Sequence, residues 1–131
     1  SAIDLASLEP RVIATREPDP DRLTVIASRS HRSERLEAAL DNVRFSECLA
    51  VGSSLKFCRL AEGRADVYPR LGGINEWDTA AGHAVLAAAG GAVTLLDGRT
   101  PLPYGNAAGR FLQPPFVAWG RAGLADDLSF S

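Results

Sequence analysis

The sequence predicts an α/β domain, and three observations carry that prediction. Residues 23–28 form a continuous apolar and β-branched run, which is typical of a strand covered on both faces. Residues 79–89 are mostly alanine, the best helix former, and Gly90-Gly91 follows as a stop signal. Strand-like and helix-like segments alternate along the chain, so helices are expected to pack on a sheet.

The remaining elements follow from the same patterns. Further strands are predicted over residues 11–15, 45–51, 65–68, 92–96 and 116–119. Helices are predicted over residues 33–43 and 55–62, the second ended by Gly63, with Leu55 and Cys58 facing neighbours. Turns and loops are predicted over residues 17–21, 28–31, 52–54, 97–98 and 101–109. Residues 1–10 are either a short helix or an irregular lead-in. We expect three segments: a lead-in over residues 1–22, an α/β domain over residues 23–120 and a tail over residues 121–131.

Composition and charge are those of an ordinary globular protein. The chain has 131 residues, enough for one domain with a real core, and is 46% hydrophobic and 23% charged. A net charge of −2 gives no sign of a nucleic-acid-binding surface. No apolar run approaches the length of a transmembrane segment, and no signal peptide is visible. Cys48 and Cys58 are expected to be reduced thiols of a cytoplasmic protein.

The alanine-rich helix carries one carboxylate that could perform chemistry. Asp78 or Thr79 can cap the first turn by accepting hydrogen bonds from free backbone N–H groups. Alternatively, the Asp78 carboxylate turns outward and binds a divalent cation, since hard oxygen ligands suit Mg²⁺. Because small side chains let a neighbouring backbone approach closely, we expect this helix to be buried.

One polar segment has the residues of a phosphate-binding turn. Residues 52–56 combine a flexible glycine turn, the hydroxyls of Ser53 and Ser54, the free amides of a helix N-terminus and the cation of Lys56. Helix N-termini attract anions through those amides and through the helix dipole. An ordinary serine-capped helix with a surface lysine has the same residues, so both interpretations stay open.

Two further segments could add donors to such a site. Residues 28–32 supply hydroxyls, arginines and the His31 imidazole, which in a plain loop would simply be solvated. Tyr68-Pro69-Arg70 places a guanidinium that could hold a phosphate bidentately or form a surface ion pair. Strand ends and helix starts should gather residues 28–31, residues 52–56 and Asp78 on one rim of the sheet, where ligands of open α/β sheets bind.

The segment Trp77-Asp78-Thr79-Ala80-Ala81-Gly82, followed by Ala89-Gly90-Gly91, resembles the C-terminal signature of the inositol monophosphatase superfamily. Members of that superfamily are Mg²⁺-dependent, lithium-sensitive phosphomonoesterases. The resemblance implies that Asp78 binds the metal. It also implies a mixed sheet layered with helices, as in the C-terminal domain of the inositol monophosphatase-like (sugar phosphatase) fold.

Other segments resemble one branch of that superfamily, the bacterial 3′(2′),5′-bisphosphate nucleotidases of the CysQ type. They are Ser28-Arg29-Ser30-His31, Gly52-Ser53-Ser54-Leu55-Lys56-Phe57-Cys58 and Asp66-Val67-Tyr68-Pro69-Arg70. The resemblance implies hydrolysis of 3′-phosphoadenosine 5′-phosphate to AMP and phosphate, a step in sulfur metabolism. It implies substrate contacts from His31, Ser53, Lys56 and Arg70, with Ser54 and Tyr68 beside them, and from Asp78 at the scissile phosphate.

The resemblance covers only part of such an enzyme. Relatives of this kind carry an acidic metal-binding segment in their first half, and Asp19-Pro20-Asp21 is no match because Arg22-Leu23 follows it. The chain contains no methionine. Either an initiator methionine was removed by processing, or the chain belongs to a longer protein. We expect the C-terminal domain of a longer enzyme, with the N-terminal half and a small-molecule substrate as partners, and leave a homodimer open.

One carboxylate cannot hold a multi-metal cluster, so the fragment alone is expected to be inactive. Two alternative functions stay open. The first is an inositol monophosphatase-type phosphatase, although such enzymes place an acidic residue before the Trp-Asp pair, and Leu71 stands seven positions before Asp78. The second is a non-catalytic domain that binds nucleotide.

Overall fold

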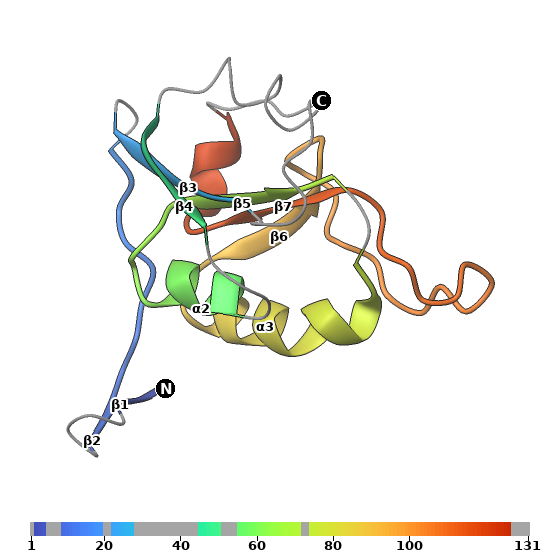
Figure 1. The fold of residues 1–131 in the computed structure, drawn as a ribbon, viewed down its shortest axis with the longest axis horizontal. Coiled ribbons are helices and arrows are strands. Elements are labelled where there is room, and N and C mark those ends of the chain that lie inside the picture. The colour runs from blue at the N-terminus through green and yellow to red at the C-terminus, as the bar shows by residue number, and fades with distance from the viewer. Residues whose placement is uncertain are drawn as a thin grey trace.

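The chain folds into a mixed sheet with helices on both of its faces (Figure 1). The structure, a computed structural model, describes residues 2–4, 9–19, 22–27, 45–50, 55–71 and 74–126. Helices α2 (Leu55–Ala61) and α3 (Glu76–Ala88) lie on one face of the sheet, and the 3₁₀ helix η1 (Ala122–Asp126) lies on the other. This arrangement confirms the predicted α/β fold.

The sheet joins parallel and antiparallel strands in the order β4-β3-β5-β7-β6. Strand β3 (Leu23–Ala27) pairs in parallel with β4 (Phe45–Ala50) and with β5 (Val67–Arg70). Strand β7 (Phe116–Trp119) pairs in antiparallel fashion with β5 and with β6 (Ala92–Leu95). All five lie at or within two residues of strands predicted from the sequence.

Alternation along the central strand decides which side chain meets which layer. Every residue of β5 is buried, because the sheet is covered on both faces. Val67 packs in a core cluster with Leu124 of η1, whereas Tyr68 packs in a second cluster with Phe57 and Leu86 of the helices. Successive side chains of a strand point to opposite faces, so Arg70 shares the helix-facing side with Tyr68.

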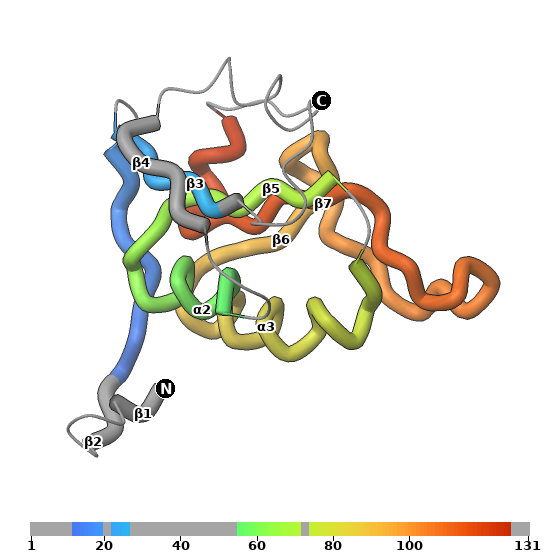
Figure 2. Tube along the Cα trace, viewed as in Figure 1, coloured from blue at the N-terminus to red at the C-terminus, as the bar shows by residue number. Residues whose placement is uncertain are grey.

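The N-terminal prediction was wrong in its details. Residues 1–10 were expected to be a helix or irregular, but β1 (Ala2–Asp4) and β2 (Glu9–Arg11) form an antiparallel pair. The strand predicted over residues 11–15 does not form, since β2 ends at Arg11 and residues 12–19 have no regular structure. Figure 2 traces residues 12–19 along the side of the domain to the start of β3.

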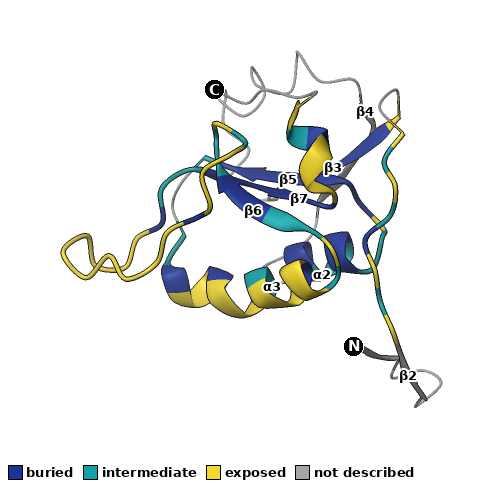
Figure 3. Cartoon of the chain, turned by 180° about the vertical axis from the view of Figure 1, so that it is seen from behind, coloured by how far each residue is buried: buried dark blue, intermediate teal, exposed yellow. Residues whose placement is uncertain are grey.

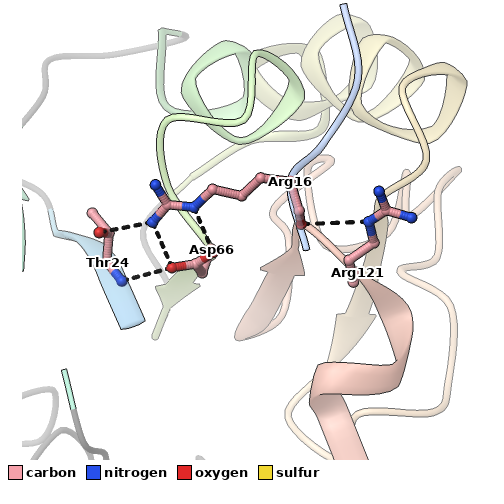
Figure 4. Close-up of polar contacts among 4 residues, drawn as sticks. All are labelled: Arg16, Thr24, Asp66 and Arg121. Carbon is pink, nitrogen blue, oxygen red and sulfur yellow. Dashed lines mark hydrogen bonds and ion pairs between the residues drawn. The ribbon is translucent and has the colours of Figure 1, made fainter. Parts of the chain in front are cut away.

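A buried carboxylate fastens this segment to the sheet (Figure 4). Asp66 has a side chain only 1% exposed, and it accepts hydrogen bonds from Arg16 Nε at 2.8 Å and Arg16 Nη2 at 2.7 Å. It also accepts the backbone N–H of Thr24 at 2.8 Å. Arg121 donates to the carbonyl of Thr15 at 3.1 Å. These contacts join the lead-in, β3, the start of β5 and the end of β7, so the carboxylate's burial is offset by charged donors.

The predicted position of helix α2 is confirmed, but the residues predicted to face its neighbours are not the ones that do. It spans Leu55–Ala61, and Gly63 follows in a left-handed conformation with φ of 78°. Leu55 is 52% exposed and Cys58 is only partly buried. The residues that face the core are instead Lys56, Phe57, Leu60 and Ala61.

Helix α3 begins earlier and is less buried than the sequence predicts. It starts at Glu76 with Asn75 at the N-cap position, so neither Asp78 nor Thr79 caps it, and that expectation was wrong. The expected burial was also wrong: only Glu76, Thr79 and Leu86 are buried, and the alanine face points outward (Figure 3). The predicted stop is confirmed, because Gly90 has φ of 110° and ends the helix.

Several predictions fall outside the described residues, namely the helix over 33–43, the loop over 28–31 and the turn over 52–54. The predicted tail has structure at its start, since η1 buries Leu124. Within the described ranges, neither α-helix has the length and apolarity needed to span a bilayer.

Candidate functional site

Three of the predicted site residues come together between α2 and β5. Tyr68 and Arg70 lie two positions apart on β5 and are 1% and 8% exposed. Lys56, the second residue of α2, is 4% exposed and places its Nζ 5.3 Å from the centre of the Tyr68 ring. An ammonium at this distance from a ring face is attracted by the ring quadrupole. Burial of β5 and the inward face of α2 therefore bring two cations and a phenol into one cluster.

The charges in this cluster perturb one another. Burial, and secondly the charge of Arg70, lower the pKa of the Lys56 ammonium. Burial raises the pKa of Tyr68, and the nearby Arg70 opposes that rise. Among the described residues, Lys56 has no carboxylate partner, and the buried Tyr68 hydroxyl has no well-formed hydrogen bond. A phosphate would supply the negative charge and the acceptor oxygens that this cluster can use.

Asp78 has the exposure that a metal ligand needs. It lies on the first turn of α3, and its carboxylate forms no hydrogen bond or ion pair with any described residue. A free, hard oxygen donor fits Mg²⁺. It does not complete a site, because the described residues contain no group of three acidic, histidine or cysteine side chains able to hold a metal. The remaining predicted site residues, His31, Ser53 and Ser54, lie outside the described residues.

Sequence reasoning missed a buried carboxylate beside Asp78. Glu76 is 7% exposed, and its two oxygens accept the backbone N–H groups of Gly105 and of Asn106, the second at 3.0 Å. The only signal in the sequence was its position at the start of a helix, where the helix dipole stabilises an acidic side chain. Its burial depends on a loop almost thirty positions further along, which no local pattern shows.

The same loop meets α3 a second time. The Nδ1 of His83 lies 2.8 Å from the Tyr104 hydroxyl oxygen, and the two rings stack with centroids 5.7 Å apart. Burial lowers the pKa of His83 and raises that of Tyr104. Both ring contacts fix the loop against the second turn of the helix.

The chain is similar in sequence to known proteins. The model of the inositol monophosphatase family matches residues 12–124. A 3′(2′),5′-bisphosphate nucleotidase CysQ of Shigella flexneri is 45% identical over 106 residues, which are 81% of this chain and 42% of that protein. A protein of Rhizobium leguminosarum bv. phaseoli, described as uncharacterized, is 58% identical over 78 residues, which are 56% of this chain and 81% of that protein.

Solved structures show the same fold. The crystal structure of CysQ from Bacteroides thetaiotaomicron matches with a TM-score of 0.71 and 34% identity, over 88% of this chain and 42% of that one. An inositol monophosphatase from Zymomonas mobilis has the same TM-score of 0.71 at 20% identity. The chain spans less than half the length of the bisphosphate nucleotidases that it resembles.

Proposed function

We propose that this chain, which belongs to the inositol monophosphatase family, forms part of a Mg²⁺-dependent phosphomonoesterase that acts on adenosine 3′,5′-bisphosphate. The products would be AMP and phosphate. The observation that carries the proposal is the cluster of Lys56, Tyr68 and Arg70, where two buried cations lie against one phenol. The relatives of 45% and 34% identity that are named CysQ support the nucleotide as substrate.

In this proposal, the cluster binds the phosphate that does not react. Lys56 provides a point charge, and the planar guanidinium of Arg70 provides paired donors for two phosphate oxygens. The Tyr68 hydroxyl, which is buried without a well-formed partner among the described residues, gains an acceptor when phosphate binds. His31, Ser53 and Ser54 are proposed to complete the pocket on the strength of the sequence alone.

Asp78 is proposed to hold Mg²⁺ beside the scissile 3′-phosphate. The metal, when bound, would polarise phosphoryl oxygens and make a water more acidic. The exposed carboxylate contributes a negative oxygen ligand, and the first turn of α3 fixes its position. The residues that the structure describes hold no group of three side chains able to bind a metal, and we propose that the N-terminal half of the full-length enzyme supplies the further ligands. A homodimer stays a prediction. We also propose a cytoplasmic location, which the free thiol of Cys58 supports.

Replacing Asp78 in the full-length enzyme tests the proposal. We expect Asp78→Asn to lower Mg²⁺-dependent release of phosphate from adenosine 3′,5′-bisphosphate by on the order of 100-fold, because a neutral amide is a poor ligand for Mg²⁺. Circular dichroism and the melting temperature should stay close to wild type, since Asp78 is exposed and its side chain forms no hydrogen bond or ion pair with a described residue.

Three controls make the result specific. Asp126→Asn removes an exposed carboxylate at the end of η1 and should leave activity unchanged. Inositol 1-phosphate, assayed beside the nucleotide, should be turned over more slowly by the wild-type enzyme. The isolated 131-residue chain should release no phosphate, because it offers one proposed metal ligand. Wild-type activity of Asp78→Asn would remove Asp78 from the site.

A further inference from the structure

We infer that Glu76 is a positioning residue for Asp78, because its buried carboxylate clamps the loop of residues 103–112 onto the first turn of α3. The inference rests on the proposed metal role of Asp78, which lies two positions after Glu76. Figure 1 shows the loop, in orange, extending past the N-terminal end of α3. The clamp is built from described residues alone.

The carboxylate of Glu76 is the centre of the clamp. It is 7% exposed, so its charge is largely withdrawn from water and needs donors. Two successive backbone amides of the loop supply them: Gly105 donates to Oε1, and Asn106 donates to Oε2 at 3.0 Å. Paired amides that converge on one anion form a strong, geometrically fixed contact.

The returning arm of the loop and Gln113, which directly follows it, bond to the same turn. The backbone N–H of Glu76 donates to the carbonyl of Phe111 at 2.8 Å, and the amide Nε2 of Gln113 donates to Thr79 Oγ1 at 3.1 Å. Thr79 in turn donates to the carbonyl of Glu76 at 2.9 Å. The residues at either end of the turn that contains Asp78 are therefore fixed by the loop, and Asp78 itself is left exposed.

The loop has a shape that needs such fastening. Arg110 and Phe111 both lie in the left-handed region, with φ of 57° and 60°, where side chains other than glycine are disfavoured. Strained residues of this kind persist when surrounding contacts determine them. Phe111 provides two such contacts: its carbonyl accepts from Glu76, and its ring lies 6.4 Å from the ring of Trp77. Loop and helix turn thus form one unit around Asp78.

Two variants of the full-length enzyme separate the clamp from simple charge. Glu76→Gln keeps the length of the side chain but turns one acceptor oxygen into a donor. Glu76→Asp keeps the charge but is too short by one methylene to reach both amides. In both, the amides of Gly105 and Asn106 should exchange hydrogen at least roughly tenfold faster, because bonds to an ionised acceptor are lost.

The metal readout uses Mn²⁺ alone, followed by electron paramagnetic resonance. Both variants should bind it about 10- to 100-fold more weakly, as when residues that orient a ligand are removed. The KM for nucleotide should stay near wild type, because Lys56 and Arg70 lie on other elements. Glu17→Gln removes an exposed carboxylate from the lead-in and should change none of these quantities.

Each outcome decides the inference. If the amides exchange faster but Mn²⁺ affinity is unchanged, Glu76 only stabilises the loop. If Glu76→Asp behaves like wild type, the charge of the side chain and not its reach to both amides is what matters. Either result overturns the inference that Glu76 positions Asp78. Unchanged exchange overturns the clamp. If urea unfolding shows that neither variant folds, Gln113→Leu tests the clamp from the loop side with the same readouts. Unchanged Mn²⁺ binding by Asp78→Asn would instead refute the metal role, while hydrogen exchange would still report on the clamp.

Discussion

Lys56 is 4% exposed, and both its burial and the charge of Arg70 lower the pKa of its ammonium. Between that lowered pKa and the ordinary value of 10.5, the unfolded chain binds more protons than the folded one, so stability rises with pH through this window. Below the window, the full cost of the buried charge remains. At neutral pH, the buried charge of Lys56 therefore weakens the fold, as functional residues often do, and we propose that its role is to bind an anion.

Replacing Lys56 by methionine should stabilise the fold and weaken the binding of nucleotide. Lys56→Met keeps an unbranched side chain of similar length and removes the charge. The free energy of unfolding should rise by about 1 kcal/mol at neutral pH, and the KM for adenosine 3′,5′-bisphosphate should rise about tenfold, for the loss of one charged contact. Urea unfolding and initial rates measure the two. Arg64→Met, whose side chain is 60% exposed, is the matched control and should change neither. A less stable variant with an unchanged KM would contradict the assignment.

At the scale of elements, α2 and α3 pack closely because α3 has a glycine, with no side chain, where it meets α2. A Cβ atom added at Gly82 of α3 would lie 2.6 Å from Cδ2 and 2.9 Å from Cβ of Phe57 on α2. The Phe57 ring cannot yield easily, since it stacks against Phe116 with centroids 6.0 Å apart. The close approach that alanine-rich sequence suggested does occur, but at this glycine and not along the whole helix.

Gly82→Ala should consequently destabilise the domain even though alanine favours helices. Overpacking costs about 1–3 kcal/mol, which exceeds the roughly 1 kcal/mol that alanine gains over glycine within a helix. We expect the free energy of unfolding to fall by up to about 2 kcal/mol in urea titrations. Gly123→Ala is the matched control, because a Cβ there meets no atom within 4 Å, and it should not destabilise. A stabilised Gly82→Ala variant would show that the two helices pack less closely than this.

The strands of the five-stranded sheet could be predicted from the sequence, whereas β1, β2 and the contacts between elements could not. β3, β6 and β7 are short apolar runs bounded by polar or turn-forming residues, so local pattern was sufficient. The start of α3 was misplaced because Glu76 and Trp77 look like loop residues until the 103–112 loop covers the first of them. Lys56 and Arg70 were named from the sequence, but their burial depends on β5 lying at the centre of the sheet.

At the scale of the whole molecule, the outward face of α3 is the feature most in need of a partner. Apart from Asp78 it is largely apolar: Trp77 is 67% exposed, Val85 is 41% exposed, and the exposed alanines Ala80, Ala81 and Ala84 lie between them. Large exposed apolar surfaces often mark an interface. The related nucleotidases are more than twice as long as the segment they share with this chain. We therefore propose that the N-terminal half of the full-length enzyme covers this face of α3.

A charge placed in the middle of that face should distinguish the two states of the chain. In the isolated chain, Val85→Lys should change the free energy of unfolding by no more than about 0.5 kcal/mol, because the side chain is partly solvated. In the full-length enzyme, the same change should cost about 2 kcal/mol or more, since an apolar contact is lost and an unpaired ammonium is buried. Val12→Lys, at a residue 89% exposed, should be neutral in both. Equal effects of Val85→Lys in the two proteins would mean that α3 keeps this face open to solvent, and the proposed N-terminal ligands for Mg²⁺ would then have to reach Asp78 from another side.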